Sequence, residues 1–279
     1  GVLPDGRRSM TPQPFDFSAA SAIDQIATDR WAASFVTGWD LGGIPNGGYQ
    51  LAVATRVALA ATGHPDPLSM HGVYLHKANN GPVEAVTTTL KTGERQSALH
   101  VSLIQNDTIV TEVTALVGSL ETATKQLLWG NAVPPDLPAP DACTRLVHTP
   151  PGLFPPPIVN EVDVRLHPDD YDQTGTRASG HPQFRGWIRY KDQHEMDAIR
   201  TMVAADVFPP ILNSGIPLGW VPTMTLTVQM RKRPTTAWLA GHFETTVANG
   251  PYFAENGELW DETGELVATV QQLAAVPRR

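Results

Sequence analysis

The clearest pattern in the chain is an almost wholly apolar run from Gly47 to Thr62, in which Arg56 is the one charged residue. A helix that is apolar on every face is one that the rest of the protein buries. The run ends at Gly63, which is followed by the sequence HPDP. Glycine accepts the left-handed conformation at a helix C-terminus, and proline cannot continue a helix. The pattern therefore predicts one long buried helix over residues 47–62.

Four segments after this helix are rich in Val, Thr, Leu and Ile, which favour strands. The turn sequences NNGP, TGER and QND separate them. The predicted strands cover residues 68–77, 82–91, 96–105 and 108–120. This order predicts a helix packed on an antiparallel meander.

The pattern of the first half returns after a Pro-dense segment, residues 121–158, which is typical of a linker. A helix is predicted over residues 192–206, and turns recur at nearly the same spacing as before. The predicted strands of this half are 159–166, 183–190, 222–231, 237–247, 252–260 and 265–276. Two such units would join their sheets edge to edge, because that covers exposed strand edges. We therefore expect an α+β fold with two similar halves.

The expected organisation has four parts. A flexible leader covers residues 1–17, and an N-terminal unit covers residues 18–120. The Pro-rich linker of residues 121–158 follows, and a C-terminal unit covers residues 159–279. The leader is predicted because its sequence, GVLPDGRRSMTPQP, lacks the apolar middle of a signal peptide.

Composition narrows the possible functions. The 279 residues carry a formal net charge of −8 with no basic stripe, so nucleic acid is not an expected partner. The single cysteine, Cys143, excludes a disulfide framework within the chain. No uninterrupted apolar run reaches the ~18 residues that a membrane span needs. We expect a soluble cytoplasmic protein with no membrane span.

The residues give no sign of metal, phosphate or serine-hydrolase chemistry. The histidines on predicted strands, His71, His76, His100 and His242, are not at metal-ligand spacing with a cysteine or carboxylate. Neither phosphate-binding glycine pattern is present, and there is no G-x-S-x-G elbow. We expect no metal and no cofactor.

Asn46, Gly47 and Gly48 stand directly before or at the start of the predicted helix. A helix N-terminus presents unsatisfied N–H groups and a partial positive charge, and glycine lets another group approach the backbone closely. Such N–H groups could stabilise the oxyanion of an attacked carbonyl, an effect of roughly 2.7–4 kcal/mol per donor. Asn46 could cap the helix or add a donor. We take these residues and Tyr49 as candidate substrate-binding residues. Alternatively, the glycines only permit a tight turn and close packing of the helix on the sheet.

Two long segments resemble a known family. The sequence GGIPNGGYQLAVA and its continuation to about residue 118 resemble the first half of acyl-CoA thioesterase II-like proteins. The segment from PTMTLTVQMRKRP to GELVATVQQLA resembles their second half. The resemblance implies a double hotdog fold, in which a long helix lies in a curled antiparallel sheet. It implies hydrolysis of a fatty acyl-CoA thioester to free acid and CoA, and further pairing of subunits into a homo-oligomer.

The resemblance also implies a catalytic Asp, Thr and Gln, all from the second half, that orient and activate a water molecule. The Thr falls on Thr246, with Thr245 as the neighbouring possibility. The Gln falls on Gln272, with Gln271 adjacent.

The Asp is expected early in the strand that begins PTMTLTV. Thr225 stands there, or Leu226 if the extra residue of RKRP is absorbed within the strand, so either alignment lacks the carboxylate. Asp206, at the end of the second predicted helix, is a substitute base. A Thr or Gln without activation cannot take a proton at pH 7, and losing a positioned base removes about 10²–10⁴-fold of rate.

Two hypotheses remain open from the sequence. One is a thioesterase in which Thr225, Thr246 and Gln272 place the water. The other is a non-catalytic acyl-CoA or lipid-binding protein that has lost the catalytic Asp. The Trp residues of the second half, Trp187, Trp220, Trp238 and Trp260, are expected to pack in the core or to line an acyl tunnel.

Overall fold

The computed structural model describes residues 16–120, 129–152, 154–171, 180–192, 194–209 and 221–276. The long apolar run forms helix α2 (Gly47–Thr62), as predicted. The Asn46 side chain caps it by accepting a hydrogen bond from the Tyr49 N–H at 3.0 Å. Gly63 ends it in the left-handed conformation, with φ 73°. Most of the helix is buried, because its apolar side chains face the sheet that surrounds it.

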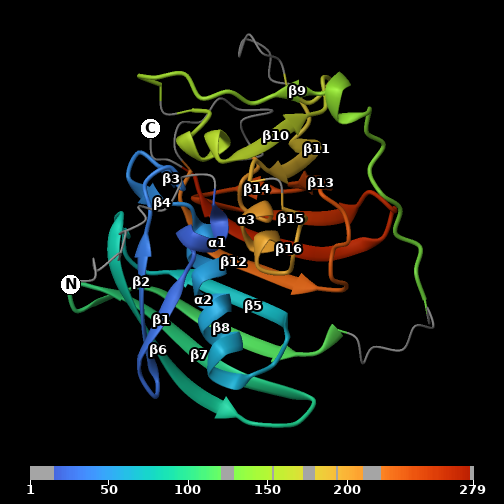
Figure 1. Ribbon diagram of the computed structural model, residues 1–279. Coiled ribbons are helices and arrows are strands. Elements are labelled where there is room, and N and C mark those ends of the chain that lie inside the picture. Colours follow the sequence, from blue (N-terminus) through green and yellow to red (C-terminus); the bar gives the residue numbers. More distant parts are fainter. Residues whose placement is uncertain are drawn as a thin grey trace, which may run out of the picture.

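The N-terminal unit is a curled antiparallel sheet with α2 lying across one face (Figure 1). The predicted meander is present, with ends that differ by a few residues. Its strands are β5 (Asp66–Tyr74), β6 (Gly81–Lys91), β7 (Gln96–Gln105) and β8 (Thr108–Gly118). Two further strands before α2, which the sequence did not reveal, extend the sheet at β6: β1 (Ile23–Ala27) and β2 (Arg30–Phe35). A short hairpin of β3 (Asp40–Leu41) and β4 (Ile44–Pro45) leads into the helix.

The C-terminal unit repeats this plan. Its main strands are β10 (Val162–Leu166), β11 (Gln183–Tyr190), β12 (Thr223–Met230), β13 (Leu239–Glu244), β15 (Tyr252–Asp261) and β16 (Leu266–Ala275). The short β14 (Ala248–Asn249) pairs with β15. The two sheets join where β5 pairs with β12 in antiparallel register, so that one continuous sheet crosses the molecule. The chain is thus an α+β double hotdog, as expected.

The second helix is much shorter than predicted. Only α3 (Arg200–Ala204) is helical in the described part of residues 192–206. The described residues before it are irregular because they make other hydrogen bonds: the Met196 N–H donates to the Thr236 carbonyl at 3.1 Å. The Asp197 carboxylate then accepts from the Arg200 N–H at 2.6 Å, which starts the helix there.

The Pro-rich segment is attached to the C-terminal unit over its described length. It contains the 3₁₀ turns η2 (Pro140–Ala142) and η3 (Pro157–Asn160). Between them, β9 (Thr144–Arg145) pairs with β10 at the edge of the sheet. The Trp187 indole also donates to the Pro138 carbonyl at 2.8 Å. Residues 121–128 of the predicted linker and 1–15 of the predicted leader lie outside the described residues.

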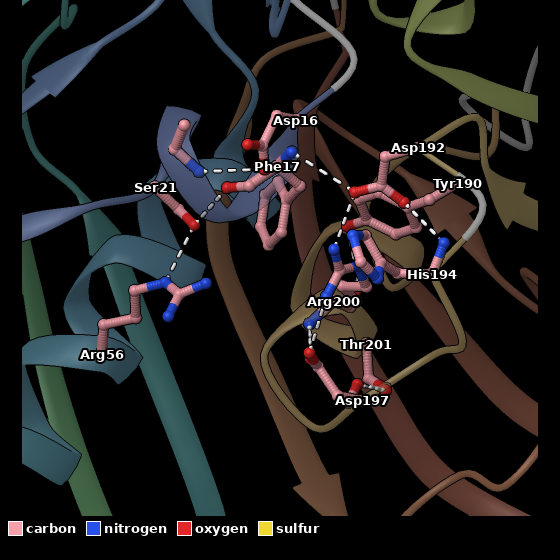
Figure 2. A network of polar contacts seen from close by, with 11 residues as sticks. Asp16, Phe17, Ser21, Arg56, Tyr190, Asp192, His194, Asp197, Arg200 and Thr201 are labelled. Carbon is pink, nitrogen blue, oxygen red and sulfur yellow. Dashed lines mark hydrogen bonds and ion pairs between the residues drawn. The ribbon is translucent and has the colours of Figure 1, made fainter. Parts of the chain in front are cut away.

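A buried polar network joins the start of the chain to α3 (Figure 2). The Arg200 guanidinium, in a residue that is 4% exposed, bonds the Asp192 carboxylate at 2.7 Å and the Asp197 carboxylate at 2.8 Å. The Phe17 N–H, at the start of α1 (Phe17–Ala20), donates to Asp192. The same guanidinium lies 5.5 Å from the Phe17 ring and 5.2 Å from the Tyr190 ring. Phe17, the last residue of the predicted leader, is therefore a fully buried core residue.

Candidate active site

Asp206 lies just beyond α3, where that helix crosses the N-terminus of α2. Its Oδ2 accepts from the Gly48 N–H at 3.0 Å and from Asn46 Nδ2 at 3.0 Å. The Asn46 amide also donates to the Asp206 backbone carbonyl at 3.1 Å. The carboxylate thus occupies the positive end of α2, where a helix terminus stabilises negative charge.

The other carboxylate oxygen faces the C-terminal sheet. Gln272 Nε2, on β16, donates to Asp206 Oδ1 at 3.0 Å and also donates to the Thr223 hydroxyl on β12. The pairing of β12 with β16 shifts between Thr223 and Thr225, and this irregularity turns Thr223 to the same face as Gln272. We call Asp206, Gln272, Thr223, Asn46 and Gly48 the Asp206 cluster.

The surroundings of Asp206 bring its pKa close to neutral pH. Burial raises the pKa of this carboxyl from 3.8 to about 6, because it disfavours the ionised form. Hydrogen bonds from Gly48 and Gly47, and then from Thr223 and Asn46, oppose this rise because they favour the carboxylate. A carboxyl group with such a pKa is ionised at pH 7 and can still accept a proton, as a general base requires.

Gly47 and Gly48 must be glycines because other residues lie too close to leave room for a Cβ atom at either position. A Cβ on Gly47 would lie 2.8 Å from Asp206 Oδ2 and 2.9 Å from the Tyr74 hydroxyl oxygen. A Cβ on Gly48 would lie 2.3 Å from the backbone carbonyl oxygen of Met202 in α3. The glycines therefore serve close packing, as one interpretation of the sequence held, but the packing is of helix on helix. The same contact brings the Gly48 N–H to Asp206.

Thr225 and Thr246 lie outside the Asp206 cluster. Thr225 pairs with Leu273 of β16, a residue 38% exposed, on the opposite face of the sheet from Gln272. Thr246 is exposed beyond the end of β13. The neighbouring possibility, Thr245, is buried, and its hydroxyl donates to the Ala254 carbonyl at 2.7 Å.

Gln271 and Gln272 point to opposite faces of the sheet, because side chains alternate along a strand. Gln271 is exposed, whereas Gln272 points inward. Leu226 is fully buried and lies directly opposite Gln272, so it adds an apolar wall there. On the other side of Gln272, in β15, its direct partner is Glu255, a residue only 5% exposed.

Tyr49 belongs to the aromatic core. Its hydroxyl donates to the Ala20 carbonyl, and its ring packs against Phe17, Phe35 and Trp39. Burial raises the pKa of Tyr49 to about 12. The structure therefore places the side chain of this expected substrate-binding residue in the aromatic core, where it anchors the first turn of α2, while its backbone N–H bonds Asn46 of the cluster.

The described residues contain no group of three or more His, Cys, Asp or Glu side chains placed to hold a metal ion. Within the same part of the chain, no helix is long and apolar enough to cross a membrane. An open cleft of about 430 Å³ lies next to Arg56, which is drawn in Figure 2, but no member of the Asp206 cluster lines it.

Family models match most of the chain. The acyl-CoA thioesterase N-terminal domain matches residues 35–118, and the acyl-CoA thioesterase C-terminal domain matches residues 138–276. The chain belongs to the acyl-CoA thioesterase family. The boundary between the two matches falls in the Pro-rich segment, between the two units of the fold.

Solved structures share the architecture. A structure from Thermobifida fusca YX, described provisionally as a thioesterase II, is 28% identical and covers 94% of this chain and 97% of its own, with a TM-score of 0.84. The acyl-CoA thioesterase II TesB2 from Mycobacterium marinum is 18% identical and covers 95% and 99%, with a TM-score of 0.69. At that identity the second likeness shows the fold alone.

Relatives are also found by sequence. An uncharacterized protein of Mycobacterium tuberculosis is 26% identical over 260 residues, which are 86% of this chain and 88% of that protein. The thioesterase-like protein TwmA of Talaromyces wortmannii is 33% identical over 92 residues, which are 32% of this chain and 26% of that protein. These likenesses are consistent with family membership.

Sequence reasoning found Asp206, Gln272, Asn46 and Gly48 but missed Thr223. An acyl-CoA thioesterase resemblance implied an Asp, a Thr and a Gln from the second half, with the Thr at Thr246 and the Asp position at Thr225. The cluster contains such a set, with Thr223 as its Thr and Asp206 as its Asp. The signal that could have found Thr223 was its place at the start of the strand, two residues before Thr225. The bulge that turns it inward has no mark in the sequence.

Proposed function

We propose that this protein hydrolyses acyl-CoA thioesters, with Asp206 as the general base. The observation that carries the proposal is a partly buried carboxyl group with a pKa of about 6, held by the N-terminus of α2 on one oxygen and by Gln272 on the other. Perturbed carboxyl groups of this kind, fixed by several donors, are concentrated at functional sites. Family membership supports the reaction class.

In the proposed reaction, a water molecule beside Asp206 attacks the thioester carbonyl carbon. Gln272 uses its amide N–H groups on Asp206 and Thr223, so its carbonyl oxygen is left to accept a hydrogen bond from the water. Asp206 takes one proton of the water as the new C–O bond forms. The C–S bond then breaks, and the departing thiolate takes the proton from Asp206. The products are the free acid and CoA, and water is the only co-substrate.

The role that we propose for Gly47 and Gly48 differs from the one expected from the sequence. Their N–H groups act on the base, since the Gly48 N–H donates to Asp206 at 3.0 Å. Once Asp206 is protonated and neutral, it accepts hydrogen bonds from these N–H groups more weakly. The positive end of α2 then acts on the negative charge that develops on the thioester oxygen.

The hypothesis of a non-catalytic binding protein rested on a missing carboxylate. Asp206 supplies a carboxylate in contact with Gln272, so the observation that favoured that hypothesis is removed. The chemistry therefore favours an enzyme over a protein that only binds acyl-CoA.

Hydrolysis of an acyl-CoA series from acetyl to palmitoyl tests the proposal. Asp206→Asn should lower kcat/KM by about 10²–10⁴-fold, because it removes a positioned base. Gln272→Ala should also lower it, whereas the matched variant of the exposed neighbour, Gln271→Ala, should keep the wild-type value. Wild-type turnover in Asp206→Asn would refute the assignment of the base. Acyl-CoA binding with no turnover of any chain length would restore the hypothesis of a binding protein.

A further inference from the structure

Tyr74 is a partly buried tyrosine from the N-terminal unit that approaches the same end of α2 as Asp206. It is the last residue of β5, and its hydroxyl donates to the Gly47 carbonyl at 2.7 Å. Burial raises the pKa of Tyr74 well above its ordinary value, and the negative charge of Asp206 raises it further. The phenol is therefore neutral at working pH and acts as a hydrogen-bond donor.

The Gly47 carbonyl and the Gly48 N–H belong to one peptide group. Tyr74 binds the oxygen end of this group, and Asp206 binds its N–H end at 3.0 Å. A peptide group is planar and rigid, so a bond at one end fixes the direction of the other. A donor on the carbonyl also polarises the peptide and strengthens its N–H as a donor, an effect of about 10–30% per bond.

We infer that Tyr74 is a positioning residue that acts on Asp206 through the Gly47–Gly48 peptide. It orients the Gly48 N–H towards the carboxylate and favours the ionised form of the base. The catalytic consequence of this inference rests on the proposed function. The effect of Tyr74 on the pKa of Asp206 does not, because it is a property of the folded protein alone.

The other groups facing Asp206 do not duplicate this contact. Asn46 approaches from the residue before α2, Thr223 from β12 and Gln272 from β16, and each bonds the carboxyl group directly. Glu255 is the nearby acidic side chain, opposite Gln272 in β15. Tyr74 is distinguished among these described residues because it acts on the peptide rather than on the carboxylate.

Tyr74→Phe tests the inference, because it removes one oxygen atom and keeps the ring. The pKa of Asp206, followed by ¹³C NMR of aspartate-labelled protein and assigned with Asp206→Asn, should rise by about half a unit on loss of part of a hydrogen bond. The acid limb of the kcat/KM profile for acyl-CoA hydrolysis should move up by the same amount. We expect kcat to fall about twofold at pH 6, because the ionised fraction of Asp206 falls from about one-half to about one-quarter, and KM to change little.

The control is Tyr252→Phe, because Tyr252 is 47% exposed at the start of β15 and should leave both quantities unchanged. An Asp206 pKa that is the same in wild type and Tyr74→Phe would overturn the inference. Should Tyr74→Phe lose near-UV circular dichroism, Tyr74→Trp, which restores a donor on a larger ring, must recover the wild-type pKa or the inference fails. A raised Asp206 pKa without any acyl-CoA turnover would support the inference and refute the proposed function.

Discussion

Lowering the pH through 6 should switch off catalysis while the protein stays folded. A general base works only when ionised, and the pKa of Asp206 is about 6. At pH 7 about nine-tenths of the molecules carry the carboxylate, and at pH 5 about one-tenth do. We therefore expect kcat/KM to be level above pH 7 and to fall about tenfold for each pH unit well below 6.

The same shift has a consequence for stability. The pKa of Asp206 is raised in the folded state above the 3.8 of an ordinary aspartate. The folded protein therefore holds this proton between pH 3.8 and 6 when the unfolded chain does not. The contribution of the group to stability is present below the lower value and is lost as the pH rises through the higher one. For a shift of about two units, the loss is about 3 kcal/mol.

Asp206→Asn isolates this effect because it keeps the size of the side chain and removes the titration. The difference in unfolding free energy between wild type and this variant, from urea titrations at pH 4 and pH 7, should change by about 2.5 kcal/mol in favour of the variant at the higher pH, because pH 4 is already just above the unfolded pKa. Groups unaffected by the substitution cancel in this difference.

The rate assay follows the loss of thioester absorbance, because thiol reagents respond to pH themselves. Near-UV circular dichroism at each pH separates protonation of the base from unfolding. A kcat/KM that stays level down to pH 5 in folded protein would refute the reasoning. So would a pH-independent difference in stability between wild type and Asp206→Asn.

Three further substitutions test other parts of the structure. Gly48→Ala should destabilise the protein by about 1–3 kcal/mol in urea unfolding, because its Cβ would meet a backbone carbonyl at 2.3 Å; equal or greater stability, as alanine's helix preference alone would give, would contradict the close crossing. Arg200→Met should cost about 3–5 kcal/mol by the same measurement, since it leaves the buried Asp192 carboxylate without its cation; a loss below about 1 kcal/mol would contradict that. Thr223→Val should lower kcat several-fold and Thr225→Val should not, and the reverse result would return the role to Thr225.

Much of the fold follows from local patterns. The apolar run over residues 47–62 predicted α2 with its ends, because the cap at Asn46 and the stop at Gly63 are both local. The strands of the meander were visible because turn sequences separate them. β1 and β2 were missed because neither shows a clear alternation: β1 is mostly exposed, and in β2 two small alanines and a serine separate the buried Trp31 and Phe35.

The second helix shows where local patterns mislead. Its sequence favoured a helix over residues 192–206, but the described residues before Arg200 make other hydrogen bonds and are not helical. Asp192 and Asp197 are used by the buried Arg200, and Met196 pairs with Thr236. None of these partners could be chosen from the sequence, because the contacts depend on how α1 and β13 are placed.

The sequence allowed most residues of the candidate site to be predicted, but not how they are arranged relative to one another. Gln272 came from a resemblance and Asp206 from its place after a helix, but 66 positions separate them and only the folded sheet brings them to 3.0 Å. Thr225 came from the alignment with the family's Asp position, and Thr223 was missed because regular alternation gives no reason to expect an inward Thr at the edge of a bulge.

The placement of Asp206 explains why two joined units are needed for one site. The carboxylate follows α3, where the negative end of a helix disfavours it, and it is partly buried, which disfavours it further. The N-terminus of α2 and Asn46, both from the other unit, offset part of this cost. Without them, the pKa would rise further and the group would be protonated at neutral pH. With full solvation, it would return towards 3.8 and be a weaker base. The pKa near 6 thus depends on the distance between the two helices, which the missing side chain of Gly48 and the pairing of β5 with β12 set.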